Sequence, residues 1–363
     1  MEVFKFGGAS VKDSKSVQNV GRIIGSNSNV IIVISAMGKT TNKIVAMARE
    51  LMDPPPAREL DMLLSTGERN AMALLAIAIH ARGQRAISLT GSQCGIITDH
   101  QPGRARIVEV RPFRILDEIA AGQIVIVGGF QGVSYKREVT TLGRGGSDTS
   151  AVALAAALGA DCEIYSDVDG VYDADPRDVS GASRIDELDY EQAQALSRAG
   201  AKVLHAQAVQ LAEERGIAIY ARHSNPALRG QTVIRRNPVP RPTGVVAVAS
   251  DPDVVSLQVV GGECGKLVDP RIVGLVGNLG LRNLAVDSSG ARGIVSRTQQ
   301  TNAAELVEAL QAKARSLGLP DVRVCSNRAL VSCIGAGLED RHDLLARAVA
   351  TLERCEIPVY EIH

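Results

Sequence analysis

A mainly parallel α/β sandwich, followed by small α+β modules, is the fold that this sequence predicts. Over the first 235 residues, short β-branched runs alternate with longer amphipathic segments, which is the pattern of strands connected by helices in a parallel sheet. Three prolines then fall within residues 235–244, and the segments after them are shorter. A chain of 363 residues is also longer than a usual single domain, so we expect at least two domains.

The first domain, residues 1–235, contains continuous apolar runs. Residues 30–34 read Val-Ile-Ile-Val-Ile, as in a strand that is buried on both faces of a sheet. Gly159 and Gly216 follow two expected helical segments, as glycines at helix ends do. On the same grounds we expect strands at 2–6, 30–34, 124–127 and 163–165, a helix ending near Gly25, and helices at 62–81, 148–158 and 205–215.

A proline-rich linker at residues 236–244 precedes the second part of the chain. There we expect two small βαβ modules in tandem, at 245–325 and 326–363, the second with a single strand, helix and strand. The expected strands are 254–260, 284–287, 329–334 and 359–362, and the expected helices are 268–279, 303–317 and 343–355.

Composition argues against several classes of function. The 40 basic and 40 acidic residues balance, Trp is absent, and aromatic residues make up 3%, which argues against a nucleic-acid partner. Apolar stretches such as 71–81 are too short to span a membrane, and the N-terminus has no signal-peptide pattern, so we expect a cytoplasmic protein. The six Cys form no C-x-x-C pair, and we expect no metal site built from protein ligands.

Neither of two common nucleotide-binding loops fits the sequence. Gly38-Lys39-Thr40 is similar to the end of a P-loop, but Val33 stands where that motif needs a glycine. The run at 143–148 lacks the last glycine of a dinucleotide-binding fingerprint. Polar, glycine-rich segments instead follow the expected strands, at the sheet edge where α/β proteins bind ligands.

The first of these segments is Lys-Phe-Gly-Gly-Ala-Ser at residues 5–10. Gly7 and Gly8 would let the backbone approach a phosphate closely, and Lys5 supplies a point charge for a transferring phosphoryl group. The alternative is a strand that ends in a glycine turn, with Lys5 in solvent. Residues 35–42, after the next strand, carry hydroxyls that either cap a helix or bind a ligand.

Charged residues mark three further segments. Glu68 lies near the head of an apolar helix, where it either interacts with the helix dipole or receives a substrate ammonium. Arg144 is flanked by glycines and precedes Ser147 at a helix start, so residues 140–150 predict an anion pocket. The acidic loop at 166–177 either binds a nucleotide with its Mg²⁺ or is a solvated turn, and it fits an EF-hand poorly.

In their order and spacing, these segments resemble the aspartate kinases of the amino-acid kinase superfamily, and most closely the monofunctional bacterial type. The resemblance covers about the first 235 residues. Residues 5–10 are similar to the family's K-[FY]-G-G-[TSA]-S. The other matching segments are S-A-M-G at 35–38 with Thr41, M-L-L-S-T-G-E-R at 62–69, G-S-Q at 91–93, G-F-Q-G at 129–132, residues 140–149, Y-S-D-V-D-G-V-Y at 165–172 and G-A-K-V-L at 200–204.

The resemblance implies an αβα sandwich of the amino-acid kinase type, followed by ferredoxin-like ACT modules. It also implies transfer of the ATP γ-phosphate to the β-carboxylate of L-aspartate, with ATP and Mg²⁺ as cofactors. The product, 4-phospho-L-aspartate, would lead towards lysine, threonine and methionine.

The resemblance also assigns roles to individual residues. The implied catalytic residues are Lys5, Arg144 and Asp148. Aspartate would bind to Thr41, Glu68, Arg144 and Ser147, with Glu68 at its ammonium and Arg144 at its carboxylate. The nucleotide would bind to Lys5, Gly7, Gly8, Ser10, Ser35, Ser166, Asp167, Tyr172, Asp175, Arg177 and Lys202.

The second part of the chain departs from the family's pattern. Gly261-Gly262-Glu263-Cys264-Gly265 replaces the family's acid-x-Pro-Gly turn, and the module at 326–363 lacks its later strands and helix. We therefore expect weak or absent inhibition by lysine and threonine, with less than about tenfold coupling to aspartate. We also expect a homo-oligomer, a dimer through the ACT-like tail, because an open βαβ unit leaves a sheet edge to cover.

Two other functions are considered for this sequence besides that of an aspartate kinase. A sister kinase with a different acceptor would use the same chemistry, although Glu68 and Arg144 favour an amino-acid zwitterion. A non-catalytic, effector-binding regulatory paralogue would have no use for Lys5, Arg144 and Asp148 together.

Overall fold

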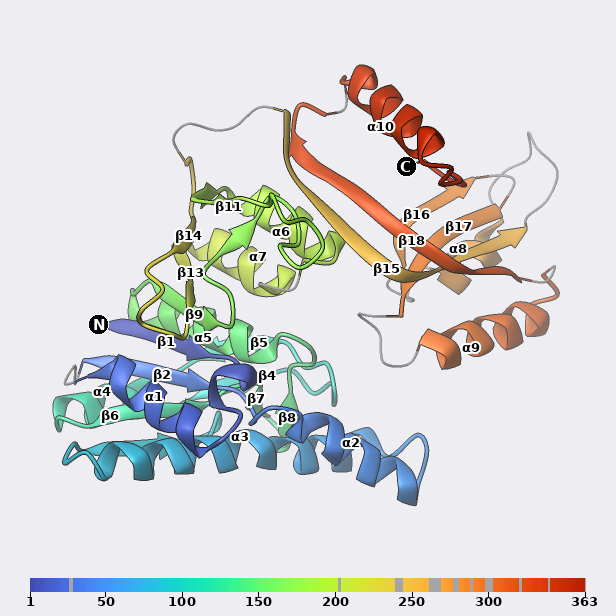
Figure 1. The fold of residues 1–363 in the computed structure, drawn as a ribbon. Coiled ribbons are helices and arrows are strands. Elements are labelled where there is room, and N and C mark those ends of the chain that lie inside the picture. Colours follow the sequence, from blue (N-terminus) through green and yellow to red (C-terminus); the bar gives the residue numbers. More distant parts are fainter. Residues whose placement is uncertain are drawn as a thin grey trace. The chain divides into compact units, whose positions relative to one another are not determined.

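The computed structural model in Figure 1 contains two compact units, Met1–Pro242 and Thr243–His363. The first is an α/β sandwich around a mainly parallel sheet, and the second is a smaller α+β unit, so the predicted fold class is confirmed. The structure describes residues 1–25, 29–201, 204–238, 244–260, 269–276, 281–287, 290–297, 303–319, 322–338 and 340–362.

An eight-stranded sheet forms the centre of the first unit, in the order β12-β14-β13-β9-β1-β2-β6-β3. The six strands from β13 to β3 in this order are parallel, and β14 is antiparallel to β13. All five residues of β2 are buried, as its apolar sequence predicts. The strands, which include the four expected ones, are β1 (Glu2–Phe6), β2 (Val30–Ile34), β3 (Ala86–Leu89), β6 (Ile124–Gly128), β9 (Cys162–Ser166), β12 (Glu187–Leu188), β13 (Ile219–His223) and β14 (Gln231–Ile234).

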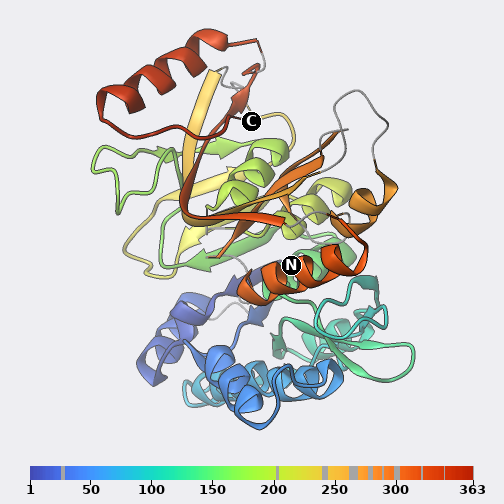
Figure 2. The same cartoon turned by 90° about the vertical axis from the view of Figure 1, so that its right-hand side faces the viewer.

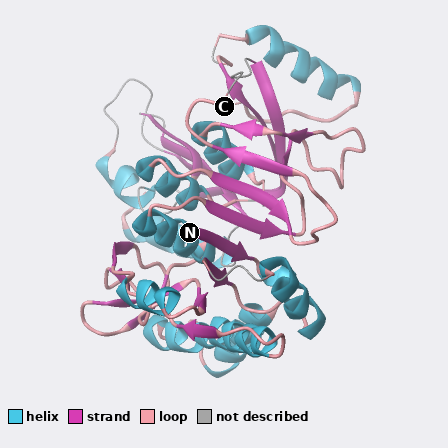
Figure 3. Ribbon diagram, turned by 90° about the vertical axis from the view of Figure 1, so that its left-hand side faces the viewer, coloured by secondary structure: helices cyan, strands magenta, loops and turns pink. Residues whose placement is uncertain are grey.

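Helices cover both faces of this sheet (Figure 3). Phe4 and Phe6 of β1 pack into a core with α1 and α3 on one face. Lys5 alternates with them, so it faces the other side, where α5 lies. α5 and α7 end at left-handed Gly159 and Gly216, as predicted. The helices, which include the four expected ones, are η1 (Gly8–Val11), α1 (Ser14–Ile24), α2 (Thr40–Leu51), α3 (Ala57–His80), α4 (Phe113–Ala120), α5 (Gly146–Leu158), α6 (Tyr190–Ala199) and α7 (Ala206–Arg215).

Helix α3 has 24 residues and, among the described residues, is the one helix long and apolar enough to cross a membrane by length and composition. In the apolar 18-residue stretch of this helix that meets the criterion, 44% is buried inside the structure. Leu75 and Ile79 of α3 belong to the same core as α1 and the sheet. The core helix of a globular protein meets the same criterion.

A second sheet of the first unit was not predicted from the sequence. Its strands are three or four residues long and have the order β5-β4-β7-β8. They are β4 (Ile96–Thr98), β5 (Ile107–Val110), β7 (Gln131–Ser134) and β8 (Val139–Thr141). A separate pair joins β10 (Val171–Tyr172) to β11 (Arg184–Ile185). Because β8 ends at Thr141, this small sheet leads directly into the glycine-rich segment around Arg144.

The second unit has a βαββαβ order of elements around a four-stranded sheet (Figures 1 and 2). The sheet order is β16-β17-β15-β18, and α8 and α9 share one core with it. Strand β17 was not predicted, whereas the expected helices and the other strands of this module are confirmed with shifted ends. The elements are β15 (Gly244–Val260), α8 (Pro270–Val276), β16 (Arg282–Asp287), β17 (Gly290–Ser296), α9 (Ala303–Ser316) and β18 (Val322–Ala336).

The long strands β15 and β18 extend beyond this sheet as a two-stranded ribbon, in which residues 244–251 pair with residues 330–336. The segment before α8 and β16 therefore pairs with the segment after α9, whereas the sequence analysis placed residues 245–325 and 326–363 in two consecutive modules. Helix α10 (His342–Arg354) follows the ribbon, and none of its residues is buried. Residues 261–265, where the altered turn was expected to matter, lie outside the described residues.

The strand expected at 359–362 is also wrong. Residues 357–362 have no regular secondary structure, although they contact the ribbon and its sheet. The Arg328 guanidinium lies 3.4 Å from the centre of the Tyr360 ring, and Ser256 Oγ donates to Glu361 Oε1 at 3.3 Å. The β-branched composition of this segment suits a strand, but side-chain contacts replace backbone pairing.

Candidate active site

The carboxyl ends of four neighbouring strands meet at one edge of the large sheet. After β1, the Gly7 N–H donates to the Tyr165 carbonyl oxygen of β9 at 3.3 Å. After β2 and β6, Ser35 N–H donates to Phe6 O at 3.1 Å, and Gly129 N–H donates to Ile34 O at 3.0 Å. The polar segments that follow these strands are therefore held together, as expected for a ligand site in an α/β sheet.

A buried ion pair lies at the centre of this edge. Lys5 Nζ is 2.6 Å from Asp148 Oδ1, and each side chain is 11% exposed. Asp148 is in the first turn of α5, whose N-terminal dipole favours a carboxylate. A Cβ on Gly7 would lie 3.5 Å from Lys5 Nζ, so the missing side chain leaves the space above the ammonium open. The alternative reading of Lys5 as a solvated surface residue is wrong.

The loop after β1 provides a close backbone cradle. A Cβ on Gly8 would lie 2.7 Å from the Ala36 carbonyl oxygen, so no other residue fits there without a shift. Gly38 N–H donates to Gly8 O at 3.0 Å and joins the loops after β1 and β2. Ser10 Oγ is buried and has no hydrogen-bond partner among the described residues, which is what a hydroxyl awaiting a ligand oxygen would show.

Glu68 reaches this edge from the middle of α3. Its Oε1 accepts a hydrogen bond from Ala36 N–H at 3.1 Å, while its buried Oε2 has no partner in the described part of the chain. Burial raises the pKa of Glu68 to about 7. Gly67 lets the helix approach this closely, because a Cβ there would be 2.9 Å from the Ala36 Cβ. A carboxylate so placed is suited to receive a cationic group.

The glycine-rich loop before α5 forms the opposite wall. Gly145 has φ +67°, and a Cβ on it would be 2.0 Å from His205 Cγ, so both conformation and packing require glycine. Ser147 is buried beside Gly129. No ion pair joins Arg144 to another described residue, and partial burial lowers the pKa of its guanidinium. An unpaired arginine on a glycine loop is available to an anionic ligand.

The acidic loop after β9 is internally hydrogen-bonded. Ser166 Oγ donates to Val168 O at 3.1 Å and accepts from Val168 N–H at 3.2 Å. Tyr172 Oη donates to Asp169 Oδ1 at 2.7 Å, which fixes the phenol. Asp167, between these residues, is exposed. Three of the expected nucleotide residues thus lie on one ordered loop beside β1.

Three other expected residues, Thr41, Asp175 and Arg177, are less closely joined to this edge. Asp175 and Arg177 form an ion pair of 2.6 Å with each other on the exposed part of the loop. Thr41 is half-buried in the first turn of α2. Lys202 lies outside the described residues.

Some residues near the site were missed from the sequence. His205 packs on Gly145, and its pKa is lowered mainly by burial, with Asp148 raising it and Arg144 lowering it. It follows directly after the G-A-K-V-L segment, which was the available signal. Asp61 and Thr232 carry no such signal, because their hydrogen-bond partners are far away in the sequence.

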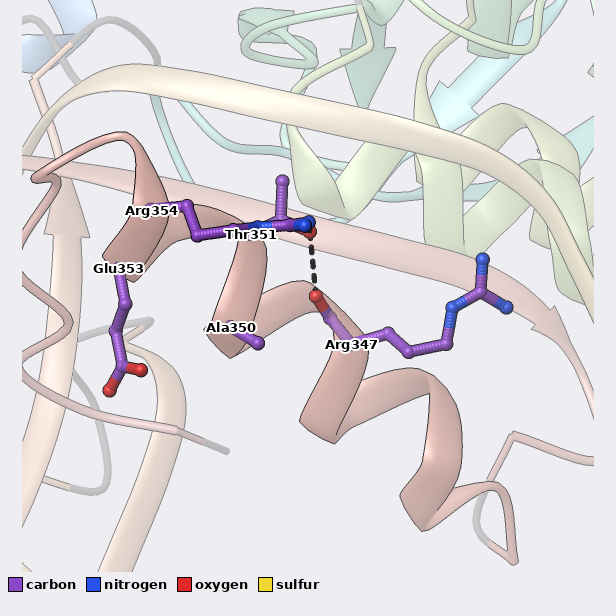
Figure 4. Close-up of a pocket in the computed structure, with 5 residues that line it drawn as sticks. All are labelled: Arg347, Ala350, Thr351, Glu353 and Arg354. Atoms are coloured by element: carbon purple, nitrogen blue, oxygen red, sulfur yellow. Dashed lines mark hydrogen bonds between the residues drawn. The ribbon is translucent and has the colours of Figure 1, made fainter.

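A hollow on the second unit does not coincide with any expected site residue. It is lined by Arg347, Ala350, Thr351, Glu353 and Arg354 of α10 (Figure 4). The hydrogen bond within it, from Thr351 Oγ1 to the Arg347 carbonyl oxygen at 2.8 Å, is internal to the helix. This open surface of one exposed helix lacks the converging polar groups of the β1 edge.

Comparison with known proteins identifies the family. The model of the amino acid kinase family matches residues 1–222. Aspartokinase from Mycolicibacterium smegmatis is 38% identical over 372 residues, covering 98% of this chain and 88% of that protein. Aspartokinase from Geobacillus stearothermophilus is 39% identical, covering 96% and 87%. The structure of E. coli aspartokinase III in complex with aspartate and ADP superposes with a TM-score of 0.84 at 25% identity, covering 98% and 92%.

The chain belongs to the amino acid kinase family, whose model covers residues 1–222, and is therefore a phosphotransferase. Within that family its function is that of an aspartate kinase, as its relatives over nearly the full chain show. The resemblance found in the sequence motifs is thereby confirmed.

Proposed function

We propose that this chain transfers the γ-phosphate of ATP to the β-carboxylate of L-aspartate, giving 4-phospho-L-aspartate, at the β1 edge. The observation that carries this proposal is the buried Lys5–Asp148 pair beside Gly7, at the sheet edge that Glu68 also reaches through its hydrogen bond from Ala36 N–H. The ligands named for the E. coli neighbour, aspartate and ADP, support the same pair of substrates.

The chemistry needs charge neutralisation and alignment more than proton transfer. A carboxylate is already a competent nucleophile, so no general base is required. Lys5 stabilises the charge of the transferring phosphoryl group, and Asp148 fixes the Lys5 ammonium in position. Because both side chains are largely buried, this arrangement is preorganised before substrates bind.

Aspartate is held by opposite charges on the two walls. Glu68 receives its ammonium through the free Oε2, and Arg144 receives its α-carboxylate. Thr41 and Ser147 add hydroxyl contacts. This assignment favours a zwitterionic acceptor over one without an ammonium, such as a carbamate.

ATP is held by the segments after β1, β2 and β9. Its phosphates lie on Gly7, Gly8, Ser10 and Ser35, and the unpartnered Ser10 Oγ fits a phosphate oxygen. The remaining nucleotide contacts are assigned to Ser166, Asp167, Tyr172, Asp175, Arg177 and Lys202.

Mg²⁺ enters this site with ATP. Among the described residues, no group of three or more His, Cys, Asp or Glu side chains is placed to hold a metal ion. Mg²⁺ characteristically binds through substrate phosphates with one or two carboxylates, so the residues present fit an ion carried by the nucleotide. Its chemistry would be to neutralise phosphate charge. We also propose a cytoplasmic homo-oligomer whose product serves amino-acid biosynthesis.

The test measures ATP consumption by the purified chain with L-aspartate, with L-glutamate and with no acceptor. Hydroxylamine traps the acyl phosphate as a hydroxamate, which separates transfer from ATP hydrolysis. We expect a hydroxamate with aspartate only, and its loss in Asp148→Asn. A glutamate product would favour a sister kinase, and no product with either would favour a non-catalytic paralogue.

A further inference from the structure

Asp61 is a carboxylate with no exposed surface in the N-terminal half of α3. Its Oδ1 accepts from Thr141 Oγ1 at 2.6 Å and from Gly103 N–H at 3.0 Å. Its Oδ2 accepts from Thr141 N–H at 3.0 Å and from Gly103 N–H at 2.9 Å. Both oxygens are thus fully used, and the donors are two backbone amides and one hydroxyl rather than a cation.

The groups that Asp61 binds belong to two different segments of one wall of the aspartate site. Thr141 is the last residue of β8, just before the glycine-rich loop. Gly103 lies in a turn that packs on this loop, because a Cβ on Gly143 would be 3.2 Å from the Gly103 carbonyl oxygen. Ala105 N–H also donates to Thr141 O at 2.9 Å. Asp61 therefore joins the turn and the loop to α3.

The same helix carries the opposite wall. Asp61 and Glu68 are about two turns apart on the buried stripe of α3. Between them, the Ser65 carbonyl oxygen accepts from Gln131 Nε2 of β7 at 3.2 Å, and β7 pairs with β8. The helix therefore fixes the distance between Glu68, at the ammonium, and the loop of Arg144, at the carboxylate.

We propose that Asp61 is a positioning residue for the acceptor: it sets the separation of Glu68 and Arg144, and thereby selects an amino acid of aspartate's length. This inference rests on the proposed roles of Glu68 and Arg144. In this proposal Asp61 does not contact the substrate. Weakening its hydrogen bonds to Thr141 and Gly103 should therefore impair acceptor binding and leave nucleotide binding unchanged.

The nucleotide side offers a matched control. Thr232 of β14 has no exposed surface. Its Oγ1 accepts from Val171 N–H at 2.8 Å and donates to Ile185 O at 2.6 Å, so it anchors the loop that carries Asp167 and Tyr172. Thr232→Val removes a buried anchor of similar kind on the other substrate's side.

The experiment compares Asp61→Asn, Asp61→Ala and Thr232→Val in the full-length enzyme. The measurements are KM for aspartate and for ATP, kcat, ADP affinity by calorimetry, and the ratio of kcat/KM for aspartate over glutamate. Asparagine keeps the shape and one acceptor oxygen, so this variant should fold even if alanine does not, because alanine leaves buried donors without partners.

We expect Asp61→Asn to raise the aspartate KM about tenfold and to lower the preference for aspartate over glutamate, with ATP KM and ADP affinity within about twofold. Asp61→Ala should raise the aspartate KM further, again with little effect on the nucleotide. Thr232→Val should instead raise the ATP KM and weaken ADP binding, with little effect on the aspartate KM. Equal losses for both substrates, or a lower kcat with both KM values unchanged, would overturn the proposal and leave Asp61 a purely structural residue.

A failure of the proposed function would look different. The wild-type chain would then use another acceptor, or none, before any variant is compared. If it used another acceptor, the KM values for that compound and for ATP would be compared between the variants in the same way. If it used none, an unchanged calorimetric affinity for aspartate in Asp61→Asn would refute the positioning role, and a selective loss would support it.

Discussion

Strand β2 of the first unit and the outer ribbon of β15 and β18 in the second both contain valine and isoleucine, yet these residues are covered very differently. Every residue of β2 is buried between helices on two faces. In the ribbon, Val248 is 39% exposed and Val331 is 58% exposed. The helix that follows the ribbon, α10, buries none of its residues. The same residue types are therefore part of a core in one unit and of an open face in the other.

This difference explains where chemistry can occur. A strand buried on both faces holds its side chains in fixed directions, so Lys5 on β1 is placed against Asp148 with little freedom. Charges held in this way, away from water, act more strongly on a developing charge than solvated ones. The outer ribbon is buried on one side only, at Ala247 and Ile334, and the exposed apolar residues of its other side form a surface rather than a site.

The largest effect that separates the two regions should come from Lys5→Ala. We expect kcat to fall about 10²- to 10³-fold, because one preorganised charge at the transferring group is lost, with a much smaller rise in the ATP KM. Steady-state kinetics with hydroxamate detection measures this. Lys15→Ala, at an exposed position of α1, is the matched control and should retain wild-type turnover. Near-normal turnover in Lys5→Ala would contradict its catalytic role.

A smaller effect is expected from Arg144→Lys. Lysine keeps the charge but loses the planar fork, so we expect the aspartate KM to rise about 10- to 100-fold while the ATP KM changes little. Initial rates over a matrix of both substrates provide the measurement. An equal rise in the ATP KM would place Arg144 in the nucleotide site.

The buried state of Glu68 predicts a dependence on pH. Its pKa in the folded enzyme is raised to about 7 by burial, whereas an ammonium ligand needs the ionised form. The aspartate KM should therefore fall about tenfold between pH 6 and pH 8. Because the folded pKa lies above the unfolded value, the contribution of Glu68 to stability is full below about pH 4.5 and is lost as pH rises through about 7.

Glu68→Gln tests this directly, since glutamine does not titrate. Its aspartate KM should be high and flat over the same pH range, and its free energy of unfolding should lose the decline between pH 4.5 and pH 7. A pH dependence that persists in this variant would assign the titration to another group.

Of the large sheet, the sequence predicted β1, β2, β6 and β9 but missed β3, β12, β13 and β14, and it missed every strand of the small sheet. β2 and β6 are continuous apolar runs, and β1 and β9 are short segments of β-branched and aromatic residues that stand out locally. β4 and β7 are three and four residues long and gain their stability from a small sheet that only the tertiary fold assembles. The segment at 357–362 has strand composition but pairs with no described strand, so propensity alone misled.

The candidate site shows the same division. Lys5, Glu68 and Arg144 stand in recognisable segments after or beside strands, and the structure brings them to one edge. Asp61 was not predicted, because its role depends on a hydrogen bond from Thr141, which lies 80 positions further along the chain. A buried carboxylate in an apolar helix carries no local sign of what it binds.

The smallest effect should come from the open face of α10. Leu345 is 45% exposed, so Leu345→Ala removes few packed atoms and should change the free energy of unfolding by less than about 0.5 kcal/mol. Leu257, in the inner half of β15, is 1% exposed, and Leu257→Ala should cost about 2–5 kcal/mol through the lost burial and the cavity it leaves. Thermal unfolding of both variants over a range of protein concentrations measures the difference within one unit. If Leu345→Ala were as destabilising as Leu257→Ala, and more so at high concentration than at low, the face of α10 would be covered by another copy of the chain in solution, and the contrast between the two regions would hold only for the isolated protomer.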